Sequence, residues 1–94
     1  MRAVEIEIRN PSGLHARPAA VFVKVAAGFR STVTVENLTR ATPPLNAKSI
    51  LSFLSGGIAR GHLVRVTADG EDEEQAIDTL RDLIASGLGE ELIL

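Results

Sequence analysis

The 94-residue chain has no cysteine, no tryptophan and no tyrosine. The lack of cysteine excludes disulfides, thiolate metal sites and a cysteine nucleophile. Three phenylalanines are the only aromatic residues, so a hydrophobic core must be built from Val, Ile, Leu and Ala. The N-terminal stretch alternates charged with apolar residues and predicts no signal peptide. No run approaches the roughly 20 apolar residues of a membrane span, and we therefore expect a cytoplasmic protein without membrane insertion.

What the sequence does contain fits one domain over 1–94, with 45% apolar and 23% charged residues. The net charge of −2 hides an uneven distribution. Residues 1–65 carry nine basic and three acidic side chains, whereas residues 66–94 carry one basic and nine acidic side chains. The basic part suits an acidic protein partner or a phosphate group. Singly scattered basic residues and a pI of about 5.6 argue against nucleic acid as a partner.

Hydrophobic periodicity predicts alternating strands and helices. In chain order we expect a strand at 4–8, a helix at 16–27, a strand at 32–36, a short third strand, a helix at 47–55, a strand at 63–68 and a helix that opens at the acidic run 71–74. Proline cannot donate a ladder hydrogen bond, so Pro43-Pro44 makes the third strand an edge strand or breaks it. Gly28 is the expected left-handed stop of the first helix, and Asn46 the expected N-cap of the second.

This order, β-α-β-β-α-β-α, predicts an α+β fold. Each helix has one apolar stripe, so all three helices can cover one face of a four-stranded antiparallel sheet. The alternating strands leave the other face to water. We therefore expect an open-faced β-sandwich, with residues 89–94 as a flexible tail.

The clearest chemistry lies where the first helix begins. With His15 as N-cap, the backbone N–H groups of Ala16 and Arg17 have no helical partner and can bind an anion. The Arg17 guanidinium has a fork that matches phosphate oxygens. The positive end of the helix dipole favours a neutral, nucleophilic imidazole and stabilises a phosphoryl group once it is attached. These residues predict a histidine that accepts and donates a phosphoryl group. The competing interpretation is an exposed capping histidine without a chemical role.

Metal and cofactor sites are not expected. The second histidine, His62, precedes a strand, and two histidines without cysteine do not predict a zinc site. The carboxylates at 69–74 lack the spacing of an EF-hand, so helix capping is expected there in place of calcium binding.

The motif GLHARPAA at 13–20 resembles the phosphorylation-site motif of HPr, the histidine-containing phosphocarrier family of the bacterial phosphoenolpyruvate:sugar phosphotransferase system. NAKSI at 46–50 is similar to the family's second motif, around its regulatory serine, and TADGEDEEQA at 67–76 is also similar. The resemblance extends over nearly the whole chain. It implies the open-faced β-sandwich, with His15 phosphorylated on Nδ1 and Arg17 beside it.

The resemblance also implies function and partners. Phospho-enzyme I would donate the phosphoryl group and enzyme IIA domains of sugar permeases would accept it, so the chain would be a carrier in sugar transport and not a turnover enzyme. Ser49 matches the serine that HPr kinase/phosphorylase modifies. The expected partner-binding residues lie around it: Lys48, Leu51, Phe53 and Leu54. A monomer is expected, because a carrier must expose one small face to several partners.

Two other functions stay open. The chain could be mainly a regulatory binding protein controlled by phosphorylation of Ser49, with little or no role in sugar transport, or it could be an adaptor without phosphoryl transfer. Residues 37–45 form a longer segment than the usual turn and third strand of the family. That difference leaves open a specialised paralogue or a domain of a larger phosphotransferase polypeptide.

Overall fold

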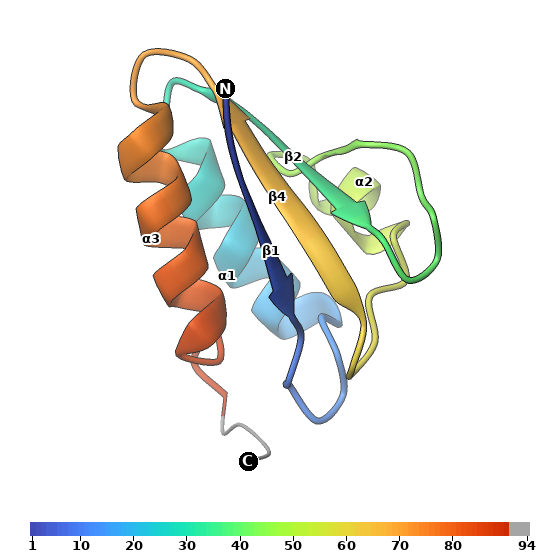
Figure 1. Cartoon of the computed structure of the whole chain (residues 1–94). Coiled ribbons are helices and arrows are strands. Elements are labelled where there is room, and N and C mark those ends of the chain that lie inside the picture. Colours follow the sequence, from blue (N-terminus) through green and yellow to red (C-terminus); the bar gives the residue numbers. More distant parts are fainter. Residues whose placement is uncertain (91–94) are drawn as a thin grey trace.

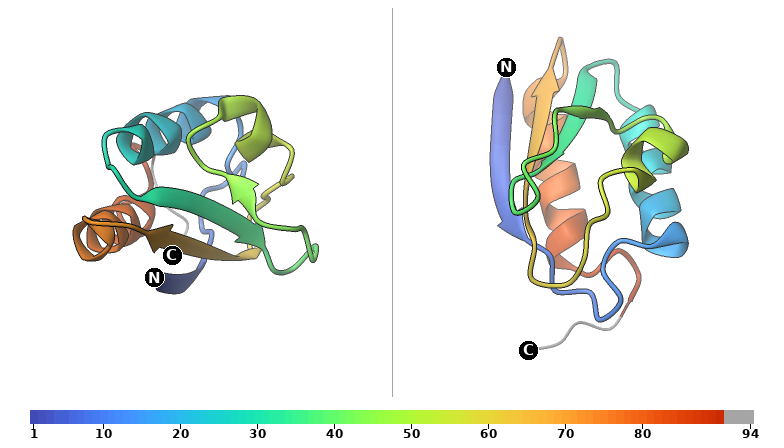
Figure 2. Two further views of the ribbon diagram at one scale, coloured as in Figure 1. Left: turned by 90° about the horizontal axis from the view of Figure 1, so that it is seen from above. Right: turned by 90° about the vertical axis from the view of Figure 1, so that its right-hand side faces the viewer.

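The computed structural model describes residues 1–90 and has the predicted order of elements (Figure 1). They are β1 (Arg2–Glu7), α1 (Ala16–Ala27), β2 (Thr32–Asn37), β3 (Leu45–Asn46), α2 (Ile50–Leu54), β4 (Leu63–Asp69) and α3 (Glu73–Ala85). The strands form one antiparallel sheet in the order β1-β4-β2-β3. All three helices cover the same face of this sheet (Figure 2). The predicted open-faced β-sandwich is confirmed.

The core lies between the sheet and the helices. Val66 of the central strand β4 pairs with Val4 on one side and with Val35 on the other. This row faces the helices, where the rings of Phe22 on α1 and Phe53 on α2 have centroids 5.1 Å apart. Both rings are buried, and the apolar stripe of α1 predicts this for Phe22.

The other face of the sheet is polar. Arg65 on β4 donates to Glu5 on β1 at 2.7 Å and to Glu36 on β2 at 3.3 Å. Opposite charges on neighbouring strands stabilise the pairing only modestly when they are this exposed. This face is therefore the solvated side of the sandwich.

The predicted start of the second helix and the predicted conformation of Gly28 are wrong. Ser49, not Asn46, is the N-cap of the second helix, and its Oγ accepts from the Ser52 N–H at 3.4 Å. Asn46 cannot take that place because it pairs with Thr34 as part of β3. Gly28 caps α1 in a right-handed conformation, with φ −75°, so the first helix does not end at a left-handed glycine.

The region of Pro43-Pro44 behaves as predicted. β3 contains two residues, follows the proline pair directly and forms one edge of the sheet. The chain reverses before it at Ala41, which has a φ of 55°. The irregular third strand lies in the connection between β2 and α2 and leaves β1 and α1, the elements that hold His15, unaffected.

Candidate functional site

His15 occupies the N-cap of α1 in an extended conformation, with φ −76° and ψ −169°. Its side chain makes no capping hydrogen bond and is 45% exposed. The first helical bond runs from the Ala19 N–H to the His15 carbonyl at 3.0 Å. The N–H groups of Ala16 and Arg17 therefore have no acceptor within the helix. The predicted cap position of His15 is confirmed, and the imidazole is free of its own helix.

The loop before His15 is held against the segment that leads into β4. Leu14 donates its N–H to the Ile58 carbonyl at 2.9 Å, and Gly13 donates to the Asn10 carbonyl at 2.9 Å. Gly13 has a φ of +66°, and a Cβ placed on it would lie 2.4 Å from the Ile58 oxygen. Only glycine fits this conformation and this approach. The position of His15 thus depends on close backbone packing one turn before the helix.

Two side chains that the sequence analysis did not select lie beside His15. The Glu90 Oε2 is 3.2 Å from His15 Nε2, and the Glu90 Oε1 accepts from Asn10 Nδ2 at 2.9 Å. Asn10 is fully buried and also donates Nδ2 to the Gly87 carbonyl at 2.9 Å. Within residues 1–90, nothing hydrogen-bonds to His15 Nδ1. No local pattern in the sequence links Asn10 to a residue 80 positions away.

Glu90 also bears on the predicted tail at 89–94. Its backbone N–H donates to the Gly87 carbonyl at 2.9 Å, and its side chain is only 20% exposed. The start of the predicted tail is therefore fixed against the His15 loop. Residues 91–94 lie outside the described part of the chain.

Arg17 lies on the first turn of α1, two residues after His15, and is exposed. In the part of the chain that the structure describes, its guanidinium forms no ion pair. The charge is thus available to an anion or to a partner protein. Neither a hydrogen bond nor an ion pair joins Arg17 to His15 within residues 1–90.

The predicted partner-binding residues divide into exposed and buried ones. Leu51 on α2 is 80% exposed, and Leu54 is 37% exposed. Phe53 is 1% exposed and packs on the core, so its assignment to a partner surface is wrong. A five-residue helix has one inward position, and the Phe53 ring fills it. Lys48 is half-buried, and its ammonium donates to the Phe29 carbonyl at 2.7 Å.

His62 is in a different environment from His15. Its Nδ1 accepts from the Ala59 N–H at 3.1 Å and lies 3.0 Å from Asn37 Nδ2. These donors point at the nitrogen lone pair, so His62 stabilises the turn before β4. The two histidines thus differ in the availability of Nδ1, and the His15 nitrogen is the free one within the described residues.

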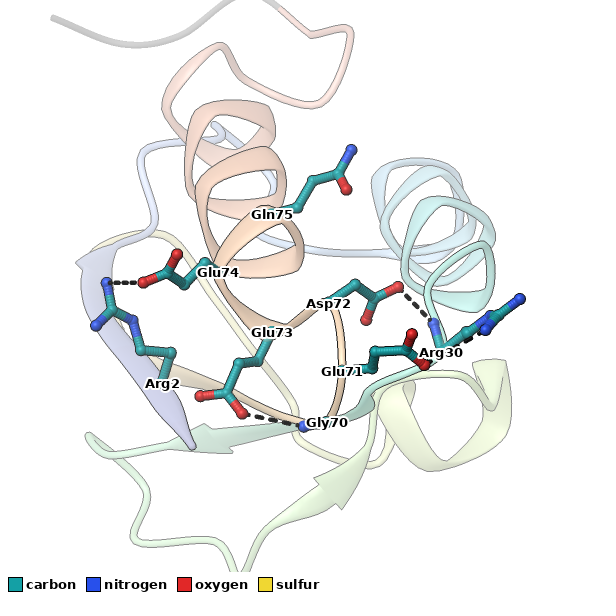
Figure 3. A pocket seen from close by; sticks show the side chains of 8 residues that line it. All are labelled: Arg2, Arg30, Gly70, Glu71, Asp72, Glu73, Glu74 and Gln75. Atoms are coloured by element: carbon teal, nitrogen blue, oxygen red, sulfur yellow. Dashed lines mark hydrogen bonds and ion pairs between the residues drawn. The ribbon is translucent and has the colours of Figure 1, made fainter.

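The acidic run 71–74 at the start of α3 lines an open pocket of about 730 Å³ together with Arg2 and Arg30 (Figure 3). The pocket lies at the end of the molecule opposite to residues 10–15 (Figure 1). Asp72 accepts from the Arg30 N–H at 2.8 Å, the Ser31 N–H at 2.9 Å and the Ser31 hydroxyl at 2.6 Å. These bonds, the one from the Ser31 hydroxyl first, lower the Asp72 pKa from 3.8 to about 2. The Asp72 carboxylate therefore ties the start of α3 to the α1–β2 connection in place of capping its own helix.

Residues 1–90 form neither a candidate metal site nor a membrane-spanning helix. No group of three or more His, Asp or Glu side chains there is placed to hold a metal ion. No helix among these residues is long and apolar enough to span a bilayer.

Known proteins resemble the chain over nearly its whole length. Residues 3–86 match the family model for the PTS HPr component phosphorylation site. The multiphosphoryl transfer protein of Haemophilus influenzae is 47% identical over 83 residues, which are 88% of this chain but 17% of that protein. Phosphocarrier protein HPr of the same organism is 40% identical over 84 residues, which are 89% of this chain and 95% of that protein.

The fold agrees with these matches. The crystal structure of HPr-C-His from Thermoanaerobacter tengcongensis is 50% identical, with a TM-score of 0.89, and covers 98% of this chain and 100% of that chain. The chain spans only 17–23% of the length of the multiphosphoryl transfer proteins that it matches. The family model, the full-length HPr relative and the fold agree that the chain belongs to the HPr phosphocarrier family of the phosphotransferase system.

Proposed function

We propose that His15 receives a phosphoryl group on Nδ1 from phospho-enzyme I and passes it to an enzyme IIA domain. The observation that carries this proposal is the open position of His15 at the start of α1. Its ring is exposed, its Nε2 faces Glu90, and its Nδ1 forms no hydrogen bond within residues 1–90. A side chain that only capped the helix would use a ring nitrogen to accept from the first-turn N–H groups.

The transfer step follows from these groups. The Nδ1 lone pair attacks phosphorus while the bond from phosphorus to the donor's histidine nitrogen breaks, and that nitrogen takes the electron pair. Charge on the equatorial oxygens is stabilised by the N–H groups of Ala16 and Arg17 and by the Arg17 guanidinium. The helix fixes the two backbone N–H groups before the phosphoryl group arrives, so these two donors need no rearrangement during transfer. The same groups serve the reverse step, in which His15 gives the phosphoryl group to its acceptor.

The surface around α2 suits the docking of these partners. Leu51 is the most exposed apolar side chain of the helix; Ile50 precedes it and Leu54 follows three residues later, each 37% exposed. Apolar residues at the centre of a protein interface with charged residues at its rim are typical of protein recognition. Arg17 supplies the positive charge that an acidic partner surface would meet. We expect a monomer, since this face must serve several partners in turn.

The test is labelling from phosphoenolpyruvate in the presence of enzyme I. The wild-type chain should take up one acid-labile, base-stable phosphate, and His15→Ala should take up none. His62→Gln is the matched control, because it changes the only other histidine and leaves the α1 terminus intact. Normal labelling of His15→Ala would remove His15 from the reaction.

Regulation through Ser49 by HPr kinase/phosphorylase remains a prediction. The Ser49 Oγ accepts one long hydrogen bond, and the residue directly precedes the exposed Ile50-Leu51 pair. A phosphate there would add charge to the docking surface. Incubation with ATP and the kinase should give an acid-stable label in the wild type and none in Ser49→Ala. Labelling that persists in Ser49→Ala would refute a regulatory role for this serine.

A further inference from the structure

A buried amide and a carboxylate far apart in the sequence form a connected chain that ends on His15. Asn10 donates to Glu90 Oε1 at 2.9 Å, and Glu90 Oε2 lies 3.2 Å from His15 Nε2. The exposed fraction rises along this chain, from 0% for Asn10 through 20% for the Glu90 side chain to 45% for the His15 side chain. The carboxylate thus lies between the core and the reacting ring.

We propose that Glu90 is a positioning residue for phosphoryl transfer, held in place by Asn10, and this inference rests on the proposed function of His15. The negative charge of the Glu90 carboxylate, 3.2 Å from Nε2, attracts a proton and repels a nitrogen lone pair, so the ring nitrogen that faces it carries the proton. A proton on Nε2 of the neutral ring leaves the lone pair on Nδ1. Glu90 therefore selects the tautomer in which Nδ1 is the nucleophile.

The contact between Glu90 and His15 also stabilises the positive charge that develops on the imidazole during transfer. When Nδ1 bonds to phosphorus and the donor nitrogen leaves with its electron pair, no proton moves at His15. The Nε2–H stays, and the imidazole ring becomes formally positive beside the Glu90 carboxylate. The buried aspartate of hydrolase triads acts in this way when it orients a histidine and stabilises the imidazolium. On the return transfer the ring gives up the phosphoryl group and regains the neutral Nε2–H form.

Asn10 gives this carboxylate its fixed position. Its Nδ2 donates at 2.9 Å both to Glu90 Oε1 and to the Gly87 carbonyl, so it ties the side chain and the backbone of the segment after α3. Within residues 1–90, the Asn10 Oδ1 is buried without a hydrogen-bond partner. Burial of a half-satisfied amide is unfavourable for folding. The side chain thus fits a role in holding Glu90 better than a role in the core.

The first readout is the tautomer of unphosphorylated His15, from the ¹⁵N chemical shifts of its two ring nitrogens at a pH where the ring is neutral. We expect the Nε2–H form in the wild type and a larger Nδ1–H population in Glu90→Ala. Glu90→Gln removes the charge but keeps an oxygen that can accept from Nε2, so it should retain more of the Nε2–H form. Glu74→Gln, an exposed glutamate on α3, is the control for loss of one charge.

The second readout is the single-turnover rate of transfer from phospho-enzyme I. Glu90→Ala should slow transfer roughly 10-fold, the low end of the range for a metal-bound histidine that loses its orienting partner. Asn10→Ala should change the ¹⁵N shifts and the transfer rate in the same direction as Glu90→Ala does. The melting temperature of Asn10→Ala shows whether this variant folds. Unchanged shifts and rate in Glu90→Ala, or a faster rate, would overturn the inference. The tautomer is measured without phosphorylation. Unchanged ¹⁵N shifts in Glu90→Ala would contradict the role of Glu90, whereas normal labelling of His15→Ala would contradict the role of His15 as the acceptor, so the two failures are distinguishable.

Discussion

Substitution of Gly13 by alanine perturbs the packing that places His15. The added Cβ would lie 2.4 Å from the Ile58 oxygen, and an ordinary van der Waals contact needs 3.4–4 Å, so the two segments must separate by about 1 Å. That shift breaks the hydrogen bond of 2.9 Å from Leu14 to Ile58. A lost bond of this kind costs about 1 kcal/mol. Alanine in the left-handed conformation costs about 1–2 kcal/mol in addition.

Gly61→Ala separates these two contributions. Gly61 has a φ of +86°, and a Cβ on it would meet nothing within 4 Å. Both variants bear the conformational cost, but only Gly13→Ala must also displace the Ile58 carbonyl. Gly13→Ala should therefore melt about 4–8 °C below Gly61→Ala, the shift that about 1 kcal/mol gives in a domain of this size.

The functional difference should be larger than the difference in stability. A displacement of about 1 Å at a reacting group lowers rates about 10²-fold. We expect Gly13→Ala to slow phosphorylation of His15 towards that extent and Gly61→Ala to leave it near the wild-type rate. Thermal unfolding and single-turnover labelling measure the two effects on the same samples. Equal melting temperatures and equal rates in the two variants would refute the dependence of the site on this close contact.

Three further predictions concern the core, the transfer chemistry and the pH dependence of the stability that Asp72 provides. Phe53→Ala should lower the free energy of unfolding by about 3–5 kcal/mol because it empties a buried ring position. Leu51→Ala should change it by no more than about 0.5 kcal/mol in thermal unfolding but should weaken enzyme I binding in calorimetry. Similar losses of stability in the two variants would contradict the assignment of Leu51 to the surface. Arg17→Glu should slow transfer to enzyme IIA most and Arg17→Lys less, since lysine keeps the charge but loses the fork; unchanged transfer in Arg17→Glu would remove Arg17 from the site. The Asp72 pKa is lowered from 3.8 to about 2 in the fold, so its contribution is complete above pH 3.8 and is lost as the pH falls through 2. Asp72→Asn should therefore melt below the wild type at neutral pH and approach it in acid, and a difference independent of pH would show that the carboxylate charge is not involved.

Elements with strong local patterns could be predicted from the sequence. The alternation in β1, β2 and β4 and the apolar stripes of α1 and α3 give the sheet, the helices and the face that they share. The start of α2 could not be predicted so well, because Asn46 and Ser49 are both good caps. Asn46 pairs with β2, so Ser49 is the cap. Strand pairing is a long-range effect, and for that reason the local sequence could not decide between the two residues.

In the candidate site, too, the features set by local sequence could be predicted and those set by long-range contacts could not. Gly13, His15 and Arg17 lie within five residues, so their local chemistry predicts a phosphoryl site at a helix start. The burial of Phe53 depends on Phe22, which belongs to another helix, and a helix of five residues has too few positions to show an apolar stripe. Glu90 reaches His15 only because the segment after α3 returns to the loop after β1, where Asn10 fixes it. Contacts of this kind are made by the tertiary fold and leave no periodic signal in the sequence.

The most direct measurement is the position of phosphorus in the wild-type chain after incubation with phosphoenolpyruvate and enzyme I. Coupling between ³¹P and ring ¹⁵N nuclei identifies the bonded nitrogen. The account predicts one phosphoryl group, bonded to Nδ1 of His15, with Nε2 still protonated. A phosphoryl group on Nε2, on another residue, or none at all would contradict it.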